Sequence, residues 1–306
     1  MHLFSPAKIN LFLAVTGKRS DGFHELLSLV APLAWGDEIT IGEIEDGEDR
    51  LSCDYAGVPL DETNLILRAA RLFREQTGVQ RFFHFQLKKQ IWPGGGLGGG
   101  SGNAVCTLEG LNEMCGNPLQ KAGLYSIAET LGSDCPLFLE KGPVIIRGRG
   151  ELVQAVPHLA EPLAAWKVGL MNPGFASPTG SLYKTLAHKG RYANPENAEE
   201  ELAELMRQIS TGGAQMNFRN DLGALLADKY LFYNTLRSIL SREEMHTFGI
   251  SGSGSSCFLL RRRRSDEAKI FSVLERFFSG VGFMIETSFL GANYKKARNC
   301  SDPTGV

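Results

Sequence analysis

The alternation of apolar and polar residues near the start of the chain predicts a β-strand. Apolar side chains occupy every second position across residues 8–15, and a period of two places alternate side chains on opposite faces of a sheet. Lys8 and Asn10 therefore share one face of this strand. Apolar runs over 26–35 and 38–44 predict two more strands, so the chain begins as a β-rich layer.

Helical periodicity appears next along the chain. Apolar residues recur at helical spacing over 63–77 and stop at Gly78, a residue favoured just after helix C-termini. A short strand over 82–87 leads into a glycine-rich segment, after which 104–115 again shows helical spacing. A further helix is expected over 119–131. The order strand, glycine-rich segment, helix is typical of loops that bind phosphate.

The pattern breaks over 157–162, where prolines interrupt it, and this break predicts two domains, residues 1–157 and 158–306. The second half offers a strand over 167–171 and finishes as strand, helix and strand. Between these elements we expect two helices, over 196–209 and 222–240.

The overall charge of the chain provides no general attraction for polyanions. Lys and Arg number 32 against 34 Asp and Glu, a formal net charge of -2, so neither nucleic acid nor an anionic membrane surface is an expected partner. The one basic block, four arginines at 261–264, follows an apolar stretch and is expected to be a solvated loop. Any anionic ligand must therefore be bound at a local site.

Cysteine usage and the chain start indicate an intracellular protein. The six cysteines lack C-x-x-C spacing and histidine-rich neighbours, which argues against a zinc site and a disulfide framework. No signal core opens the chain, motif-like sequence begins by Pro6, and no apolar run approaches the ~20 residues of a membrane helix. We expect a cytoplasmic protein with reduced thiols and no membrane association.

The segment from Pro93 to Asn103 carries the strongest chemical signal, because six of its first eight residues are glycine. Glycines let backbone N–H groups approach a phosphate closely, and the start of a helix adds a favourable dipole. A flexible linker is the structural alternative, but linkers do not usually lie between a strand and a helix of one domain. The segment is therefore predicted to hold the phosphates of a nucleotide.

Two better-known nucleotide loops match this segment less well. A P-loop ends in Gly-Lys-Ser/Thr, whereas this segment ends in Gly100-Ser101-Gly102. A dinucleotide-binding loop follows the first strand of its fold and has an acidic residue about 20 positions on, whereas position 120 is Gln120. Hydride transfer is therefore the weaker interpretation.

Three segments together resemble the signature motifs of the GHMP kinase family, in their usual order and across nearly the whole chain. They are Pro6 to Leu11, Gly94 to Asn103, and Gly249 to Ser256. The resemblance implies an α+β, two-domain GHMP kinase fold, with an N-terminal domain similar to ribosomal protein S5 domain 2 and a ferredoxin-like C-terminal domain. ATP and an alcohol acceptor would bind between these domains.

Two more segments narrow the resemblance to one branch of that family. Lys18 to Leu26 resembles its segment with a Phe-His or Tyr-His pair, and Gly132 to Phe138 resembles its element containing Asp and Pro. This branch phosphorylates the 2-hydroxyl of a cytidine-diphosphate-linked methylerythritol in non-mevalonate isoprenoid synthesis. The resemblance therefore implies that acceptor, with ATP as the donor and Mg²⁺ accompanying it.

The same resemblance implies roles for individual residues. Asp134 would accept the proton of the attacking hydroxyl and Lys8 would be its cationic neighbour, which suits phosphoryl transfer. Phe23 and Tyr183 would bracket the cytosine, and His24 would pair with its polar edge. The implied ATP-binding residues are Asn64, Pro93, Gly94, Gly95, Gly96, Leu97, Gly98, Gly99, Gly100, Ser101 and Gly102. The implied acceptor-binding residues are Asn10, Phe23, His24, Thr179, Tyr183, Gly252, Ser253 and Gly254.

The chain departs from the family in its second and third motifs. Trp92-Pro93 stands where Pro-Met is common, and Ser101-Gly102 stands where two serines are common. Ser101 is therefore the hydroxyl expected to contact phosphate or magnesium, and no set of metal ligands is assigned. The third motif has serine where threonine and alanine are usual. These changes preserve the backbone chemistry of both loops.

Two alternative functions stay open at this point. One is another GHMP kinase with homoserine, mevalonate or a sugar as acceptor, which Phe23-His24 disfavours. The other is a GHMP-fold protein that binds a ligand without catalysis, which the presence of both Lys8 and Asp134 disfavours. The quaternary structure is expected to be a monomer or a homodimer.

Overall fold

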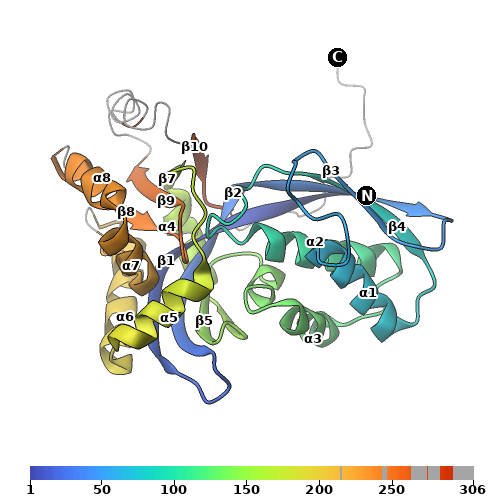
Figure 1. Ribbon diagram of the computed structural model, residues 1–306, viewed down its shortest axis with the longest axis horizontal. Coiled ribbons are helices and arrows are strands. Elements are labelled where there is room, and N and C mark those ends of the chain that lie inside the picture. Colours follow the sequence, from blue (N-terminus) through green and yellow to red (C-terminus); the bar gives the residue numbers. More distant parts are fainter. Residues whose placement is uncertain (214–215, 243–246, 263–273, 275–282, 292–306) are drawn as a thin grey trace.

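Two long antiparallel strands, β1 (His2–Lys18) and β2 (His24–Ile44), connect the two halves of the molecule (Figure 1). The computed structural model describes residues 1–213, 216–242, 247–262, 274 and 283–291. Sheets and helices are mixed along these residues, so the α+β class expected from the sequence is confirmed.

The first sheet has six strands among the described residues, in the order β3–β4–β2–β5–β6, with β1 also paired to β2. Helices α1, α2 and α3 lie together on one side of it (Figure 1). The strands are β3 (Arg50–Cys53), β4 (Phe82–Lys88), β5 (Val144–Gly148) and β6 (Leu152–Ala155). The helices are α1 (Leu65–Thr77), α2 (Gly99–Met114) and α3 (Lys121–Leu131).

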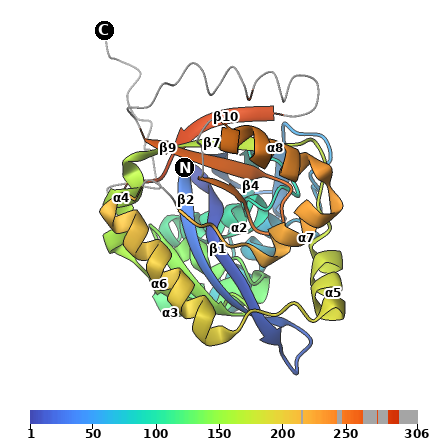
Figure 2. The same cartoon turned by 90° about the vertical axis from the view of Figure 1, so that its left-hand side faces the viewer.

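The second sheet contains, among the described residues, four antiparallel strands in the order β10–β7–β9–β8. Figure 2 views this end of the molecule, with β7, β9 and β10 together and helix α6 crossing beside β1 and β2. The strands are β7 (Trp166–Asn172), β8 (Phe248–Ile250), β9 (Cys257–Arg262) and β10 (Phe283–Ser288). The helices are α4 (Ala160–Ala164), α5 (Thr179–Lys189), α6 (Pro195–Thr211), α7 (Asp221–Lys229) and α8 (Leu231–Arg242), and short 3-10 helices cover Pro136–Leu139 and Pro157–Leu159.

The prediction of separate strands over 26–35 and 38–44 was wrong, because both belong to the continuous strand β2. Gly36 and Asp37 do not interrupt it. A Cβ at Gly36 would lie 2.1 Å from the carbonyl oxygen of Ser5, so the absence of a side chain lets β1 approach β2 closely. Gly36 thus keeps β1 and β2 paired at the position where the sequence predicted a break between two strands.

Helix α1 confirms the predicted helix over 63–77. The Asn64 side chain accepts a hydrogen bond from the N–H of Ile66 at 3.0 Å, and Gly78 ends the helix with φ of 71°. Helix α2 starts at Gly99, five residues before the predicted start at 104. Apolar periodicity begins only at Ala104, so the pattern of hydrophobic positions could not detect the glycines that form the first turn.

The single helix predicted over 222–240 was wrong, because Tyr230 divides it into α7 and α8. Its extended backbone, with φ of -117° and ψ of 111°, ends α7. The strands at 167–171 and at the C-terminal end are confirmed as β7, β9 and β10. The helix expected between the last two strands lies outside the described residues.

The basic block at 261–264 was interpreted as a solvated loop, and for Arg261 this was wrong. Arg261 lies in β9, is 6% exposed, and pairs through its guanidinium with Glu286 of β10. Lys167 of β7 also approaches Glu286, with 3.3 Å between Nζ and Oε1. A buried arginine needs such a partner, and Glu286 is distant in sequence. Arg263 and Arg264 lie outside the described residues.

The apolar core does not divide at the predicted domain boundary. Ile9 and Leu11 of β1 belong to one buried cluster with Val168, Leu170 and Phe258 of the second sheet. The division into 1–157 and 158–306 therefore stays a prediction. None of the helices in the described part of the chain is long and apolar enough to span a membrane.

Candidate active site

Lys8 and Asn10 point from the same face of β1, as the alternation predicted. Lys8 Nζ donates to Asn10 Oδ1 at 2.7 Å, and Asn10 Nδ2 donates to Ser28 Oγ at 2.9 Å. Ser28 is fully buried and donates in turn to the carbonyl of Phe12. This chain of hydrogen bonds across β1 and β2 fixes the position of the Lys8 ammonium.

Asp134 approaches Lys8 from the turn after helix α3. Lys8 Nζ lies 3.7 Å from Asp134 Oδ2, an ion pair longer than a hydrogen bond. The Lys8 side chain is 5% exposed and that of Asp134 is 46% exposed. Burial lowers the pKa of Lys8 below that of an ordinary lysine, and Asp134 opposes that shift. The pair therefore combines a buried cation with an accessible carboxylate.

The glycine segment forms a tight loop that ends on helix α2. Gly94, Gly96 and Gly98 have φ of 69°, 76° and 71°, the left-handed region that other residues rarely adopt. Gly98 is the N-cap of α2, so the free N–H groups of the first turn face the loop. The backbone N–H of Lys8 donates to the carbonyl of Leu97 at 3.0 Å and ties the loop to β1.

The second glycine-rich turn, residues 251–256, packs directly on the first. Ser251 Oγ donates to the carbonyl of Gly96 at 3.0 Å, and the N–H of Ser256 donates to the carbonyl of Gly95 at 3.1 Å. A Cβ at Gly96 would lie 2.3 Å from the Ser251 carbonyl oxygen. The two turns thus require glycine to reach each other, which explains why motifs about 150 positions apart form one structure.

Two cavities meet at Asp134. The first, of about 500 Å³, is lined by Lys8, Asn10, Asn64, the loop from Pro93 to Ser101, Gly252 and Ser253. The second, of about 800 Å³, is lined by Phe23, His24, Lys18, Arg149 and Lys184. Asp134, Ser101, Thr179 and Tyr183 line both. The arrangement gives two ligands a shared boundary at one carboxylate.

Two of the glycines predicted to bind ligand do not line either cavity. A Cβ at Gly102 would meet Ser5 Oγ at 3.0 Å, and one at Gly254 would meet Leu226 at 2.3 Å. Both glycines therefore serve close packing inside the protein. Asn64 lines the first cavity, but its side chain also caps α1 and donates from Nδ2 to the carbonyl of Pro59 at 2.7 Å.

The aromatic residues predicted to bracket a base both line the second cavity, where each contacts a different neighbour. The His24 ring stacks on Tyr183, with centroids 4.7 Å apart, and the Arg149 guanidinium lies 5.1 Å from the centre of the Phe23 ring. Among the described residues, no ring contact joins Phe23 to Tyr183. His24 Nε2 is buried without a hydrogen-bond partner. Burial and then the charge of Lys18 lower the pKa of His24, which favours its neutral form.

Thr179 and Ser253 close the boundary between the cavities. Their hydroxyl oxygens lie 2.7 Å apart, so the start of helix α5 is joined to the second glycine turn. Both residues were predicted to bind the acceptor. Their contact joins the 251–256 turn to the wall that contains Tyr183.

Sequence analysis missed several residues of this site. Ser28 sits under Asn10, Lys89 lines the first cavity, and Lys18, Arg149 and Lys184 line the second. Ser28 lies two positions from Leu26 in an apolar strand, and a lone polar residue on a buried face was the available signal. Lys18 begins a segment that resembles the family, whereas Lys89, Arg149 and Lys184 are far apart in sequence and belong to no local pattern.

The donors available for a metal ion are few. No cluster of three or more His, Cys, Asp or Glu side chains suited to a metal occurs in the part of the chain that the structure describes. Ser101 and Asp134 are oxygen donors at the cavity boundary. This sparse set fits Mg²⁺, which is commonly held by one or two protein oxygens together with substrate phosphates.

Residues 64–142 match the family described as "GHMP kinases N terminal domain". The chain is 36% identical over 260 residues to the 4-diphosphocytidyl-2-C-methyl-D-erythritol kinase of Protochlamydia amoebophila, covering 85% of this chain and 84% of that protein. The crystal structure of a 4-(cytidine 5'-diphospho)-2C-methyl-D-erythritol kinase superposes with a TM-score of 0.76 at 25% identity, over 95% of this chain and all of the other.

The fold extends to kinases with other acceptors. A homoserine kinase from Cytophaga hutchinsonii superposes with a TM-score of 0.71 at 16% identity, covering 95% of each chain. Similarity at this identity shows a common fold alone. The fold by itself therefore does not identify an acceptor.

Proposed function

The chain belongs to the 4-diphosphocytidyl-2-C-methyl-D-erythritol kinase family, and we propose that it transfers the γ-phosphate of ATP to the 2-hydroxyl of that cytidyl compound. The observation that carries the proposal is the position of Asp134, beside Lys8 and on the boundary of two cavities. The first cavity has the glycine loop for a nucleotide. The second has aromatic and cationic side chains for a charged acceptor with a base.

Asp134 is the group we assign to accept the acceptor's proton. Its carboxylate is accessible, so a hydroxyl can reach it, and Lys8 is held near it by Asn10. The hydroxyl oxygen attacks the γ-phosphorus, its proton passes to Asp134, and the bond to the β-phosphate oxygen breaks to release ADP. Little covalent chemistry is required of the protein, so the alignment of the two cavities is its main contribution.

Lys8 and the start of helix α2 are assigned to the negative charge of the transferred group. Lys8 is buried and its ammonium has a fixed direction, which suits electrostatic stabilisation in a site of low dielectric. The N–H groups after Gly98 lie at a helix N-terminus, where anions bind favourably. Both groups would act on the same phosphates, because the Lys8 side chain lies beside Gly98, the N-cap of α2.

Mg²⁺ would enter with the nucleotide. Ser101 and Asp134 are the protein oxygens proposed to hold it, and the ion would neutralise charge on the phosphates. Within the protein, Lys8, Ser251 and Ser256 donate hydrogen bonds to the loop.

The acceptor is proposed to occupy the second cavity with its base near His24 and Tyr183. His24 has an unpaired buried nitrogen. Tyr183 offers an aromatic ring, and burial and then the charge of Asp134 raise the pKa of its hydroxyl. Lys18, Arg149 and Lys184 supply positive charge for the diphosphate. A small polyol with little apolar area is thus positioned by the distant parts of the same molecule.

An assay of ADP release against a panel of acceptors tests this function. We expect turnover with the cytidyl compound and background rates with homoserine, mevalonate and galactose. Turnover with one of the other three and none with the cytidyl compound would support a different kinase of the same fold. ADP release with none of them, despite ATP binding, would support the non-catalytic alternative.

We also propose a cytoplasmic location and a monomer or homodimer. Cys53, Cys115, Cys135 and Cys257 are reduced thiols, which suits a reducing compartment. Burial raises the pKa of the Cys135 thiol to about 12, so this neighbour of Asp134 is chemically inert. Sedimentation analysis of the purified chain distinguishes the two assembly states.

A further inference from the structure

We propose that Asp37 is a positioning residue for nucleotide binding, because its carboxylate joins the two segments that flank the glycine loop. Asp37 lies in β2 beside Gly36 and is fully buried. It is not among the residues that line either cavity. Its effect on ATP must therefore pass through the loop, and the inference rests on the proposed function only in taking that loop as the nucleotide site.

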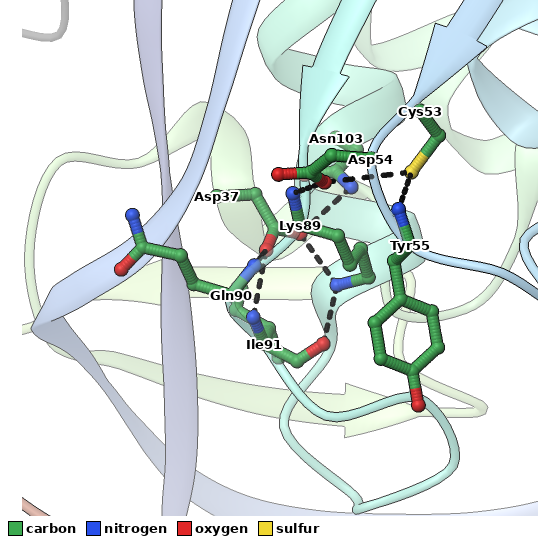
Figure 3. Close-up of polar contacts among 8 residues, drawn as sticks. All are labelled: Asp37, Cys53, Asp54, Tyr55, Lys89, Gln90, Ile91 and Asn103. Carbon is green, nitrogen blue, oxygen red and sulfur yellow. Dashed lines mark hydrogen bonds and ion pairs between the residues drawn. The ribbon is translucent and has the colours of Figure 1, made fainter.

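Four donors converge on the Asp37 carboxylate (Figure 3). Oδ1 accepts the backbone N–H groups of Gln90 and Ile91, both at 2.7 Å. Oδ2 accepts Lys89 Nζ at 2.6 Å and Asn103 Nδ2 at 2.9 Å. A carboxylate has enough acceptor positions for all four donors.

These donors belong to both sides of the loop. Lys89, Gln90 and Ile91 follow strand β4 and lead into it, whereas Asn103 is on helix α2, which leaves it. Both ends of the loop are thus hydrogen-bonded to the side chain of Asp37. A buried carboxylate with charge-assisted hydrogen bonds has strong directional preferences, so it limits how far the two flanks can separate.

Lys89 connects this cluster to the nucleotide cavity. Its ammonium also donates to the carbonyl of Ile91 at 2.5 Å, and it lines the first cavity. A Cβ at Gly99 would lie 3.1 Å from Lys89 Nζ. The ammonium therefore sits against the first residue of α2, where a shift would change the direction of the N–H groups that face the phosphates.

The backbone of Lys89 is held separately. Its N–H donates at 2.8 Å to Oδ1 of Asp54, from the segment after β3, as Figure 3 also shows. Asp54 is exposed, and its hydrogen bonds to this region join it to Leu87 and Lys89 at the end of β4. Asp37 differs because it also accepts a hydrogen bond from Asn103 of α2. This second contact is the reason for proposing that Asp37 controls the shape of the loop.

The test replaces Asp37 with Asn in the full-length chain. Asp37→Asn keeps the side-chain shape but removes the charge, so its Nδ2 would face Lys89 Nζ, which can only donate, and the amide of Asn103 would have to turn its unpaired Oδ1 toward it. The two flanks then lose their common acceptor. We expect the Kd for ATP, measured by calorimetry without acceptor, to rise on the order of 10-fold to 100-fold, as for a displaced binding group.

Asp49→Asn is the matched control for a purely structural loss. Asp49 is also buried, at 4% side-chain exposure, pairs with Arg74 at 2.6 Å, and accepts the N–H of Phe83 at 2.9 Å. It contacts neither the glycine loop nor α2. Both variants should lower the melting temperature, but only Asp37→Asn should weaken ATP binding, with the KM for the acceptor unchanged.

Asn103→Ala provides a second measurement if Asp37→Asn does not fold. It removes the contact between Asp37 and α2 from a side chain that also lines the first cavity, and it should raise the Kd for ATP by a smaller factor. Equal ATP affinity in the wild type and in every folded variant at positions 37 and 103 would overturn the proposal, as would an equal loss in Asp49→Asn. A wild type that binds ATP but does not phosphorylate the cytidyl compound would instead contradict the proposed function.

Discussion

Lys8 and Asp134 form an ion pair with 3.7 Å between Nζ and Oδ2, in which the lysine is buried and the carboxylate is open to both cavities. The two residues come from a strand and from a turn 126 positions later, and their exposures of 5% and 46% differ in the direction that phosphoryl transfer requires. The cation must keep its place, whereas the carboxylate must meet a mobile hydroxyl.

Asp134→Asn should fold normally and lose turnover by about 100-fold to 10,000-fold, because the amide preserves shape and cannot accept the proton. The KM for ATP should change less than turnover does, because the loop contacts are intact and Ser101 remains as an oxygen proposed to hold Mg²⁺. Steady-state kinetics together with a melting curve measures both effects. Near-normal turnover in a folded variant would contradict the assignment of Asp134 as the proton acceptor.

Loss of the proton from Lys8 should lower kcat/KM for ATP at alkaline pH. Burial lowers the pKa of Lys8 below the ordinary value of 10.5, so the cation is lost in the free enzyme below pH 10.5, and kcat/KM reports that form. Between the lowered pKa and 10.5 the unfolded state binds more protons, so the contribution of Lys8 to stability rises with pH.

Lys8→Arg is the control for this pH profile, because arginine stays charged well above pH 12. The variant should show lower activity from its larger head group but no alkaline decline below pH 10.5. An unchanged decline in Lys8→Arg would assign the titration to another group.

Gly98→Ala should weaken ATP binding, whereas Gly100→Ala should have a smaller effect. Gly98 has φ of 71°, and an added Cβ would lie 2.8 Å from Phe138. The left-handed backbone alone costs an ordinary residue roughly 1 to 2 kcal/mol, or about tenfold in affinity. At Gly100 the nearest atom to a Cβ is Leu65 Cδ1 at 3.9 Å. Calorimetry with ATP compares the two, and equal losses would mean that phosphate contact, rather than loop conformation, is affected.

The extent to which the sequence predicted this site varies with the distance between contacting residues. Lys8 and Asn10 were placed on one face by a period of two, and their hydrogen bond confirms it. Asp37 was interpreted as part of a break between strands, because the requirement for glycine at position 36 arises from Ser5 on another strand. Arg261 was interpreted as solvated because Glu286, its partner, is 25 positions away.

The same limit applies to the second cavity. The resemblance pointed to Phe23, His24 and Tyr183, yet their mutual arrangement depends on helix α5 and on Arg149. Neither local periodicity nor a motif reports that His24 stacks on Tyr183. The relative positions of these side chains therefore depend on contacts between separate elements, which the sequence pattern does not report.

Tyr183→Ala should raise the KM for the cytidyl acceptor and leave the KM for ATP nearly unchanged. Loss of a stacking ring costs about 1 to 3 kcal/mol per base, which corresponds to a rise of roughly 5-fold to 150-fold. Tyr192→Ala is a matched control, because Tyr192 also approaches His24, at 6.1 Å, but does not line the cavity. Equal effects of the two variants would indicate that they act by displacing His24.

His24 should determine which base the enzyme accepts. Its Nε2 is buried without a partner in a side chain that lines the second cavity, and burial lowers its pKa, so at neutral pH the imidazole is neutral and this nitrogen is unsatisfied. A base that offers the matching group at its edge satisfies this nitrogen, whereas a base with the opposite polarity leaves two buried polar groups unpaired. Stacking on Tyr183 is available to any base and cannot make this distinction.

The uridyl analogue of the acceptor should therefore show a kcat/KM lower by about 100-fold or more. Free methylerythritol phosphate, which has no base, should be a very poor acceptor. His24→Phe keeps an aromatic ring against Tyr183 but removes both nitrogens, so it should reduce the preference for the cytidyl over the uridyl compound while turnover persists. Competition kinetics with both acceptors measures the ratio directly. If His24→Phe retains the full preference, the base is read by backbone groups, and if the wild type accepts both compounds equally, the base does not contribute to specificity.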